Sequence, residues 1–473
     1  MNFQPVLLPT DLLIFLLMAC AAFFAFQASR HAPSREAWRR VGRQPVAMAS
    51  AVVLLVFAVI GFLDSLHYRP QLPPGQNEQA DAKAIYSSEV LSALDALLEP
   101  LRIQMEKTYS APFARNSFQR ETVELPGGGQ ARVYPRLGYG ARHLQEGEKA
   151  WRDIARRLIW TPFPALAITG LLLIIAAARA RRHPSAGWQD ALQRILAGRT
   201  EFAWRSVLAV VFLASLLIAA GVALAPHYHM LGTDKVGQDV LYLSLKSIRT
   251  GLVIGTLTTL IMLPFAAALG IAAGYLGGWV DDAIQYLYTV LNSIPSVLLI
   301  AASVLMIQVA IDTHPQWFDT AAQRSDARLL ALCVILGMTS WTGLCRLLRG
   351  ETLKLRELEY VQAARSFGAS TAQILRRHIL PNVMHIVLIT VALDFSSLVL
   401  AEAVLSYVGI GVDPGTVSFG TMINAARAEL AREPVVWWSL AAAFGFMLTM
   451  VLAANLLADA VRDAFDPRRQ MAR

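Results

Sequence analysis

Long apolar segments alternate with short polar ones along most of the chain. Six of them follow residue 200, at about 206–226, 250–274, 284–310, 328–348, 383–405 and 436–458. Three more precede it, at about 5–28, 45–63 and 161–178. Each approaches or exceeds the length with which a helix crosses the hydrocarbon core of a bilayer. The pattern predicts an all-α polytopic membrane protein with a core of six spans and about three additional N-terminal spans.

Residues 64–160 interrupt this pattern with prolines, glycines and mixed charges. Apolar residues recur at a helical spacing within 78–108, and segments 122–125 and 131–134 flank a run of three glycines as the strands of a hairpin would. A small extracytoplasmic domain is expected here.

A short apolar stripe follows the third additional span. Trp188, Leu192, Ile195 and Leu196 fall on one face of a helix that Ser185 could cap. Flanking basic residues favour a helix at the inner membrane surface over an internal packing helix. The predicted organisation is therefore two spans in 1–63, the insert in 64–160, a third span and elbow helix in 161–200, and the six-span core in 201–467.

Basic residues predict the orientation of the chain. Five arginines lie between the first two spans, at positions 30, 35, 39, 40 and 43. Positive charge in short loops marks the cytoplasmic side, so the N-terminus is expected outside. Alternation of the spans then places residues 351–382 and the C-terminus in the cytoplasm, in agreement with the basic residues that flank that loop.

Composition narrows the function class. Hydrophobic residues make up 55% of the chain and charged residues 16%, which is too apolar for a soluble protein of this length. The net charge of +8 comes from arginines at span ends rather than from a basic stripe, so no nucleic-acid partner is expected. Cys20, Cys333 and Cys345 form no metal-like cluster, and no metal site is expected. Scattered histidines and the absence of hydrolase motifs argue against an enzyme.

The polar loop 351–382 contains helix-forming residues around a single glycine. It predicts a helix, a turn at Gly368–Ser370 and a second helix that Ser370 or Thr371 caps and Pro381 ends. This loop resembles the coupling loop of ATP-binding-cassette importer permeases, whose pattern is Glu-Ala-Ala, three residues, Gly, and later Ile-Leu-Pro. The chain has Gln362 at the position of the glutamate, which removes one charge.

Further motifs resemble the dipeptide/oligopeptide branch of that family, specifically its C-type subunit. They are HMLGTDKVGQD at 229–239, GYLGGWVD at 274–281, SWTG at 340–343, AEAVLSYVGIG at 401–411 and DPR at 466–468. The resemblance covers about residues 200–467 and leaves out the insert.

The resemblance implies a type I importer core and a set of residues that couple it to an ATPase. This set is Glu359, Tyr360, Gln362, Ala363, Ala364, Arg365, Gly368, Ala369, Arg377, His378 and Pro381. It also implies a bacterial inner-membrane complex with a second permease subunit, two ATPase subunits that carry ATP and magnesium, and a periplasmic or lipid-anchored substrate-binding protein. No cofactor is expected on this chain.

The resemblance implies a peptide substrate, with nickel chelates or other non-peptide solutes as the alternative. A stand-alone secondary transporter or channel is the main rival, but it would need paired broken helices or inverted repeats. The insert could dock the substrate-binding protein or could simply cap the spans.

Residues 232–239 have the glycine spacing of a nucleotide-binding P-loop. Gln238 replaces the phosphate-binding lysine and Asp239 the magnesium-binding hydroxyl, so no nucleotide is expected. We expect a structured turn at the outer mouth of the path, formed by Gly232, Thr233, Asp234, Gly237 and Asp239.

Two acidic residues lie within the fifth core span, Asp394 and Glu402. They could line a polar path, or could hydrogen-bond to a neighbouring helix or to the partner subunit. Asp281 and Asp282 lie on a second short cytoplasmic loop, where an acidic contact to a partner competes with a plain exposed turn.

Overall fold

The computed structural model describes residues 3–30, 32–71, 86–124, 130–145, 147–180, 187–413 and 415–465. In these residues eight helical stretches are long and apolar enough to cross a membrane, and the protein is a predominantly helical polytopic membrane protein. They are Pro45–Asp64, Ala150–Arg179, Trp204–Leu224, Val240–Leu276, Ser296–Thr313, Ala321–Arg356, Thr371–Val408 and Trp438–Phe465. A shorter apolar helix covers Pro9–Phe23.

The described residues fall into two compact units. The first unit lies within 1–7, 39–250 and 417–453, and the second unit within 8–38, 251–416 and 454–473. The chain passes between them five times, and three of these passages lie inside helices, namely α2 (Ala32–Arg43), α10 (Val240–Leu276) and α18 (Trp438–Phe465).

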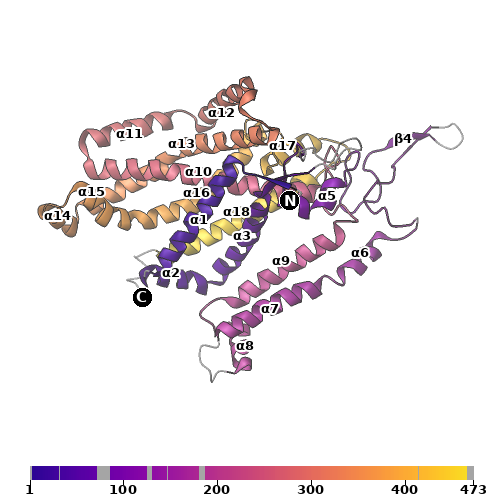
Figure 1. Ribbon diagram of the computed structural model, residues 1–473, viewed down its shortest axis with the longest axis horizontal. Helices are drawn as coiled ribbons and strands as arrows, with labels where there is room; N and C mark the ends of the chain where they lie inside the picture. Colours follow the sequence, from indigo (N-terminus) through magenta and orange to yellow (C-terminus); the bar gives the residue numbers. More distant parts are fainter. Residues whose placement is uncertain are drawn as a thin grey trace, which may run out of the picture. The chain divides into compact units, whose positions relative to one another are not determined.

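The first unit is built on three long helices, α3 (Pro45–Asp64), α7 (Pro162–Ala180) and α9 (Trp204–Leu224). Helix α9 packs along both α3 and α7, and α7 and α9 run side by side in Figure 1. The predicted elbow helix is α8 (Trp188–Leu196), whose Ile195 is buried against α7 and α9 while Trp188 is exposed. Ser185 lies outside the described residues, and Gly187 holds the position before the helix.

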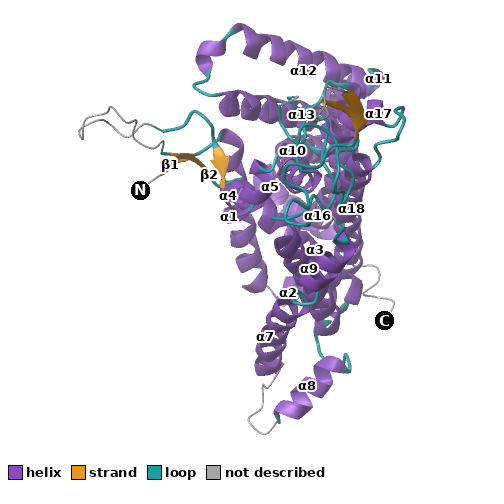
Figure 2. Cartoon of the chain, turned by 90° about the vertical axis from the view of Figure 1, so that its right-hand side faces the viewer, coloured by secondary structure: helices purple, strands orange, loops and turns teal. Residues whose placement is uncertain are grey.

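The insert, also in the first unit, contains little regular structure. A three-stranded antiparallel sheet joins β1 (Phe3–Val6), β2 (His67–Pro70) and β3 (Leu91–Ser92), with β1 and β2 side by side in Figure 2. The predicted hairpin is present as β4 (Glu121–Glu124) and β5 (Gln130–Val133), and its glycine run lies outside the described residues. Helix α6 (Ala150–Leu158) follows the hairpin and packs against α9.

The helical spacing within 78–108 overstated the helix content. Over the described residues 86–108, only α4 (Ala93–Leu97) and α5 (Glu99–Ile103) form. Ser92 begins α4 with a capping box, and Pro100 lies in the first turn of α5, where its missing N–H costs nothing. Because a proline removes one backbone donor and crowds the preceding turn, Pro100 favours a break between the two short helices.

The second unit contains α1 (Pro9–Arg30), the later part of α10, α11 (Gly278–Ser293), α12 (Ser296–Thr313), the 3-10 turn η1 (Pro315–Trp317), α13 (Ala321–Arg356) and α16 (Leu380–Val408). One predicted span, 284–310, is wrong as a single helix, because the chain breaks at Ile294 and Pro295. Ile294 is extended, the conformation favoured before proline, and Pro295 cannot donate to the preceding turn. The first predicted span, about 5–28, corresponds to α1, which starts at Pro9 after the strand β1.

Helix α1 is held by α13. The backbone N–H of Thr10 donates to Oδ2 of the buried Asp326, at 3.0 Å, and so satisfies a donor at the start of α1. Leu13 and Ile14 then pack against a core cluster formed by α10, α12 and α13. The N-terminal helix is therefore an integral part of the second unit.

Candidate functional site

The 351–382 loop begins inside α13, which ends at Arg356. It continues as α14 (Glu359–Ser366), a turn at Gly368, α15 (Thr371–Ile374) and the π-helical turn η2 (Leu375–Ile379) (Figure 1). Gly368 has φ +82°, a conformation that glycine adopts without strain. Ser370 Oγ accepts a hydrogen bond from the N–H of Gln373, at 3.3 Å, so Ser370 is the cap of the second helix.

Pro381 does not end the second helix. The helix runs without a break from Thr371 to Val408, so the prediction of a stop at this proline was wrong. A proline removes one backbone donor and crowds the preceding turn. The wide π-turn Leu375–Ile379 lies directly before it, and Pro381 occupies the first turn of α16, where a missing N–H is tolerated.

Helix α14 has one buried side and one exposed side. Val361 is 2% exposed and joins a core cluster with residues of α10, α11, α13 and α16. Ala364 and Ala369 pack against the same cluster. On the other side Phe367 is 91% exposed, which makes it a free aromatic side chain at the tip of the turn. Sequence reasoning missed Phe367, although an apolar residue beside a turn glycine on a polar loop was a usable signal.

The predicted coupling residues divide between these two sides. Those that are exposed are Glu359, Tyr360, Gln362, Ala363, Arg365, Gly368, Arg377 and Pro381. Ala364, Ala369 and His378 are half-buried. The Gln362 amide donates to the backbone oxygen of Glu357 at 3.3 Å, a contact that a glutamate could not make. Tyr360 accepts a hydrogen bond from Asn382 at 3.2 Å, which joins α14 to the start of α16.

The turn between α10 and α11 is tied to α13. Arg349 donates Nε and one terminal nitrogen to the two carboxylate oxygens of Asp281, at 2.6 and 2.7 Å. The hydrogen bonds from Arg349 lower the pKa of Asp281. Asp282 is exposed, so of the two acids only Asp282 presents its carboxylate outward.

The structure brings the five predicted residues of the 232–239 turn together. Asp234 Oδ1 accepts hydrogen bonds from the N–H groups of Val236 and Gln238, at 3.0 and 2.8 Å. Thr233 and Asp239 form a β-bridge, and both are buried. Asp239 Oδ1 accepts the N–H of Leu241 at 2.8 Å and so caps the start of α10.

The insert is fastened to this turn by groups that sequence reasoning did not single out. Glu106 accepts the N–H groups of Gly138, Tyr139 and Gly140 at 2.8 to 3.0 Å, and its own N–H donates to Gly237 O at 3.0 Å. His229 lies between Asp239, at 2.8 Å, and Glu106, at 3.4 Å. Trp438 of α18 donates its indole N–H to Thr233 O at 2.9 Å. These partners are distant in sequence, so no local pattern marks them.

The two acidic residues of α16 lie in different surroundings. Glu402 is 1% exposed and accepts a hydrogen bond from Ser406 Oγ at 2.7 Å. Asp394 is half-buried at the middle of α16, and within the described residues its carboxylate accepts no hydrogen bond. Glu402 is thus buried within the second unit, whereas Asp394 is half-buried and its carboxylate has no hydrogen-bond partner in the described residues.

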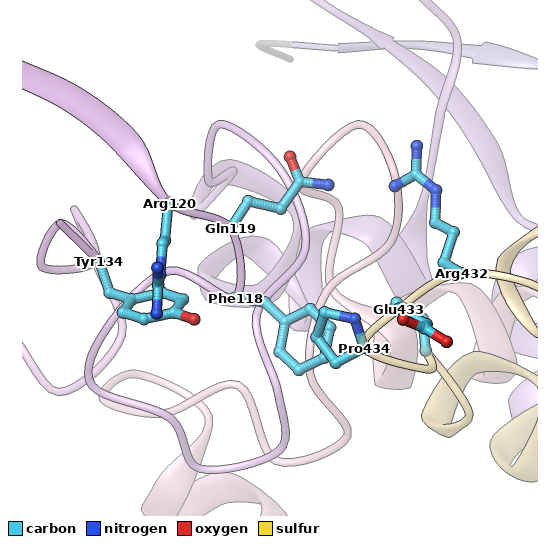
Figure 3. Close-up of a pocket in the computed structure, with 8 residues that line it drawn as sticks. Phe118, Gln119, Arg120, Tyr134, Arg432, Glu433 and Pro434 are labelled. Atoms are coloured by element: carbon cyan, nitrogen blue, oxygen red, sulfur yellow. The ribbon is translucent and has the colours of Figure 1, made fainter. Parts of the chain in front are cut away.

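A cavity of about 450 Å³ in the first unit lies between the insert and the chain before α18 (Figure 3). Arg120 lies over the ring of Tyr134, with 5.2 Å from the guanidinium carbon to the ring centre. Arg432 pairs with Glu429 at 2.9 Å, and Glu433 also lines the cavity. The lining itself carries Arg120, Arg432 and Glu433, a net charge of +1, and Glu429 offsets this charge through its pair with Arg432.

No group of three or more histidine, cysteine, aspartate or glutamate residues in the described part of the chain is placed to hold a metal ion. Residues 266–471 match the family described as "Binding-protein-dependent transport system inner membrane component". This match contains α11 to α16 and the whole 351–382 loop.

Curated relatives extend the similarity. The chain is 33% identical over 239 residues to the oligopeptide transport system permease protein OppC of Mycobacterium tuberculosis (strain ATCC 25618 / H37Rv), covering 50% of this chain and 76% of the relative. It is 27% identical over 304 residues to the dipeptide transport system permease protein DppC of Bacillus subtilis (strain 168), covering 61% of this chain and 88% of the relative. It is 32% identical over 240 residues to the glutathione transport system permease protein GsiD of Pectobacterium atrosepticum, covering 51% of this chain and 73% of the relative.

Proposed function

The chain belongs to the family of inner-membrane components of binding-protein-dependent transport systems, and we propose that it is the peptide-importing permease subunit whose 351–382 loop receives the motion of an ATPase. It is a multi-pass inner-membrane protein of the transport permease class. The names of its relatives support dipeptides or oligopeptides as substrates.

The exposed tip of the 351–382 loop carries this proposal. Phe367 is 91% exposed, beside a glycine turn and exposed charged residues of α14. An aromatic side chain without intramolecular cover suits a partner pocket, because aromatic residues dominate the binding energy of interfaces. The partner that a permease needs at such a loop is the subunit that hydrolyses ATP.

The buried side of the loop explains how a push would reach the membrane. Val361 and Ile374 lie in one cluster with Ile271 of α10, Leu348 of α13 and Val387 of α16. Packed interiors transmit displacement rather than absorbing it. Movement of α14 would therefore shift three long helices together and change the accessibility of the path.

The loop must lie in the cytoplasm for this mechanism, with the N-terminus outside and the C-terminus inside. The arginines between α1 and α3 favour that orientation. ATP and magnesium would bind the two ATPase subunits, and a second permease subunit would complete the path.

The insert then lies on the outer side, where a periplasmic or lipid-anchored binding protein delivers substrate. It contacts the 232–239 turn directly before α10, which would be the outer end of that helix in this orientation. Docking of the binding protein there is the role we propose for it.

Purification of the assembled complex through a tag on this chain tests the docking role. Phe367→Ala is expected to weaken retention of the ATPase about tenfold or more, since interface anchors of this kind contribute about 2 kcal/mol. Gly368→Pro is expected to abolish uptake while the chain still inserts in the membrane. Phe163→Ala, which truncates an exposed phenylalanine of α7, is the matched control and should behave as the unsubstituted chain.

Normal ATPase retention and normal peptide-stimulated ATP turnover in both loop variants would reject the docking role. Uptake by this chain alone, driven by an ion gradient, would favour a secondary transporter instead.

A further inference from the structure

The pair Asp281 and Arg349 joins the first turn of α11 to the later part of α13. Its two parallel hydrogen bonds, at 2.6 and 2.7 Å, are the geometry in which arginine binds a carboxylate most specifically. The side chains are 14% and 25% exposed, so water screens them little. Helix α11 has one buried side chain, Ile284, and its partly buried Val280, Tyr288 and Leu291 pack against the same core cluster. The ion pair thus attaches the first turn of α11 to α13, and Thr342 of α13 donates a hydrogen bond to Asn292 at the other end of α11, at 3.1 Å.

The same stretch of α13 also holds the end of α10. A Cβ atom on Gly274 would lie 2.7 Å from both the carbonyl oxygen of Arg349 and Cβ of Thr352, so the two helices touch through their backbones there. One turn beyond Thr352, Arg356 directs its guanidinium at the carbonyl oxygens of Gly274 and Tyr275, at 3.5 and 3.4 Å. The last two turns of α13 thus contact both sides of the α10–α11 turn.

These contacts lie next to the candidate docking loop. Helix α13 ends at Arg356, and α14 begins at Glu359. The cluster that buries Val361 of α14 also contains Leu355 of α13 and Ile284 of α11. A displacement of α14 therefore reaches the position of Arg349 through seven residues of continuous helix.

We propose that Asp281 and Arg349 are positioning residues that make the α10–α11 turn move together with the 351–382 loop. This inference rests on the proposed function, because it needs the loop to be where force is applied. The ion pair carries the motion to α11, and through the break at Pro295 to α12, which α13 contacts along another part of its length. Both carboxylate oxygens of Asp281 are occupied by Arg349, so this acid acts within the chain and not on a partner.

The test measures peptide taken up per ATP hydrolysed by the complete complex in proteoliposomes. Asp281→Asn and Arg349→Gln are each expected to lower this ratio about fivefold while the ATPase stays bound. The double variant is expected to lower the ratio no more than the worse single variant does, because both residues act through one contact. The double variant also leaves no unpaired charge, so it assembles even where a single variant folds poorly.

Two further variants complete the design. Asp282→Asn removes the same charge one residue away without touching Arg349, and its ratio should equal that of the unsubstituted chain. Arg349→Lys keeps the positive charge but loses the two parallel donors of the guanidinium. Its ratio of peptide taken up to ATP hydrolysed should lie between that of the unsubstituted chain and that of Arg349→Gln.

An unchanged ratio in Asp281→Asn and Arg349→Gln, or losses that multiply in the double variant, would overturn the inference. If Phe367→Ala still uncouples transport in that case, the docking role stands and only the role of the ion pair is wrong. If the unsubstituted complex retains no ATPase, the docking role fails and the inference fails with it.

Discussion

His229 Nδ1 lies 2.8 Å from a carboxylate oxygen of Asp239, and both side chains are buried. The other ring nitrogen faces Glu106 of the insert at 3.4 Å. Burial alone would lower the pKa of His229, but the hydrogen bonds to Asp239 and Glu106 outweigh it and raise the pKa to about 9. The imidazolium between two carboxylates therefore fastens the insert to the 232–239 turn.

This arrangement predicts that the contact between the insert and the 232–239 turn is stable only within a certain pH range. Because the pKa of His229 is raised, its stabilising effect is complete below about 6.5 and is lost as the pH rises through about 9. Burial alone would raise the pKa of Glu106, but its hydrogen bonds lower it to about 2, so its contribution is lost only as the pH falls from about 4.5 toward 2.

Amide hydrogen exchange of residues 104–118 should therefore accelerate between pH 7 and 9.5, after correction for the intrinsic rate. His229→Gln should remove that step. Equal protection at both pH values in the unsubstituted chain would contradict the assignment of a charged His229.

Lys246 is expected to be critical for the stability of the first unit. Its ammonium lies 2.9 Å from Asp64 and 3.0 Å from Asp95, and both acids are buried. Lys246→Met leaves two buried carboxylates without their cation, a type of change that costs about 3 to 5 kcal/mol. Thermal unfolding in detergent should show the loss. Lys107→Met is the control, because its partner contact with Glu121 is on the surface and contributes less than about 1 kcal/mol.

Substitution of Asp394 is expected to affect the uptake of substrate rather than the assembly of the complex. A charged side chain near the middle of a span is costly in lipid, so this half-buried carboxylate should meet water or the partner subunit. If Asp394 meets the amino terminus of a peptide in the path, Asp394→Asn should lower the uptake of a peptide with a free amino terminus about tenfold. The uptake of the same peptide in its N-acetylated form should not change. Glu402→Gln should instead reduce the yield of folded chain, since Glu402 is buried. An identical effect of Asp394→Asn on both peptides would contradict the path role.

The long helices could be predicted from sequence because their signal is local. Apolar runs placed α3, α7, α9, α10, α13, α16 and α18 to within several residues, although α10 and α13 extend well beyond the apolar segments. Their polar ends, such as Val240–Arg249 and Arg349–Arg356, are stabilised by tertiary contacts, and hydropathy does not record these.

What the sequence did not reveal depends on pairs far apart in the chain. Asp326 and Thr10 are 316 positions apart, and His229 and Glu106 are 123 apart. Pro295 and Pro381 show a second reason. The two prolines have the same local preference, yet one breaks a helix and the other lies in a continuous one, because a wide turn precedes only Pro381.

The 351–382 loop could be identified from sequence because its motif is compact. Which of its residues are buried and which are exposed could not be predicted. The pair Ala363 and Ala364 looks equivalent in sequence, whereas the structure exposes Ala363 and packs Ala364 against the core. Ala364→Trp would therefore disturb the loop's attachment, and only residues on the side of Phe367 remain available to a partner.

Cross-linking from position 367 tests the account most directly. The variant combines Phe367→Cys with Cys20→Ser, which removes the exposed native thiol and keeps the buried Cys333 and Cys345. In inside-out membrane vesicles that contain the whole complex, a short thiol-to-amine cross-linker should join this chain to the ATPase subunit, and ATP should change the yield. Labelling of the same thiol by an impermeant reagent from the outer side, with no ATPase adduct, would contradict the account.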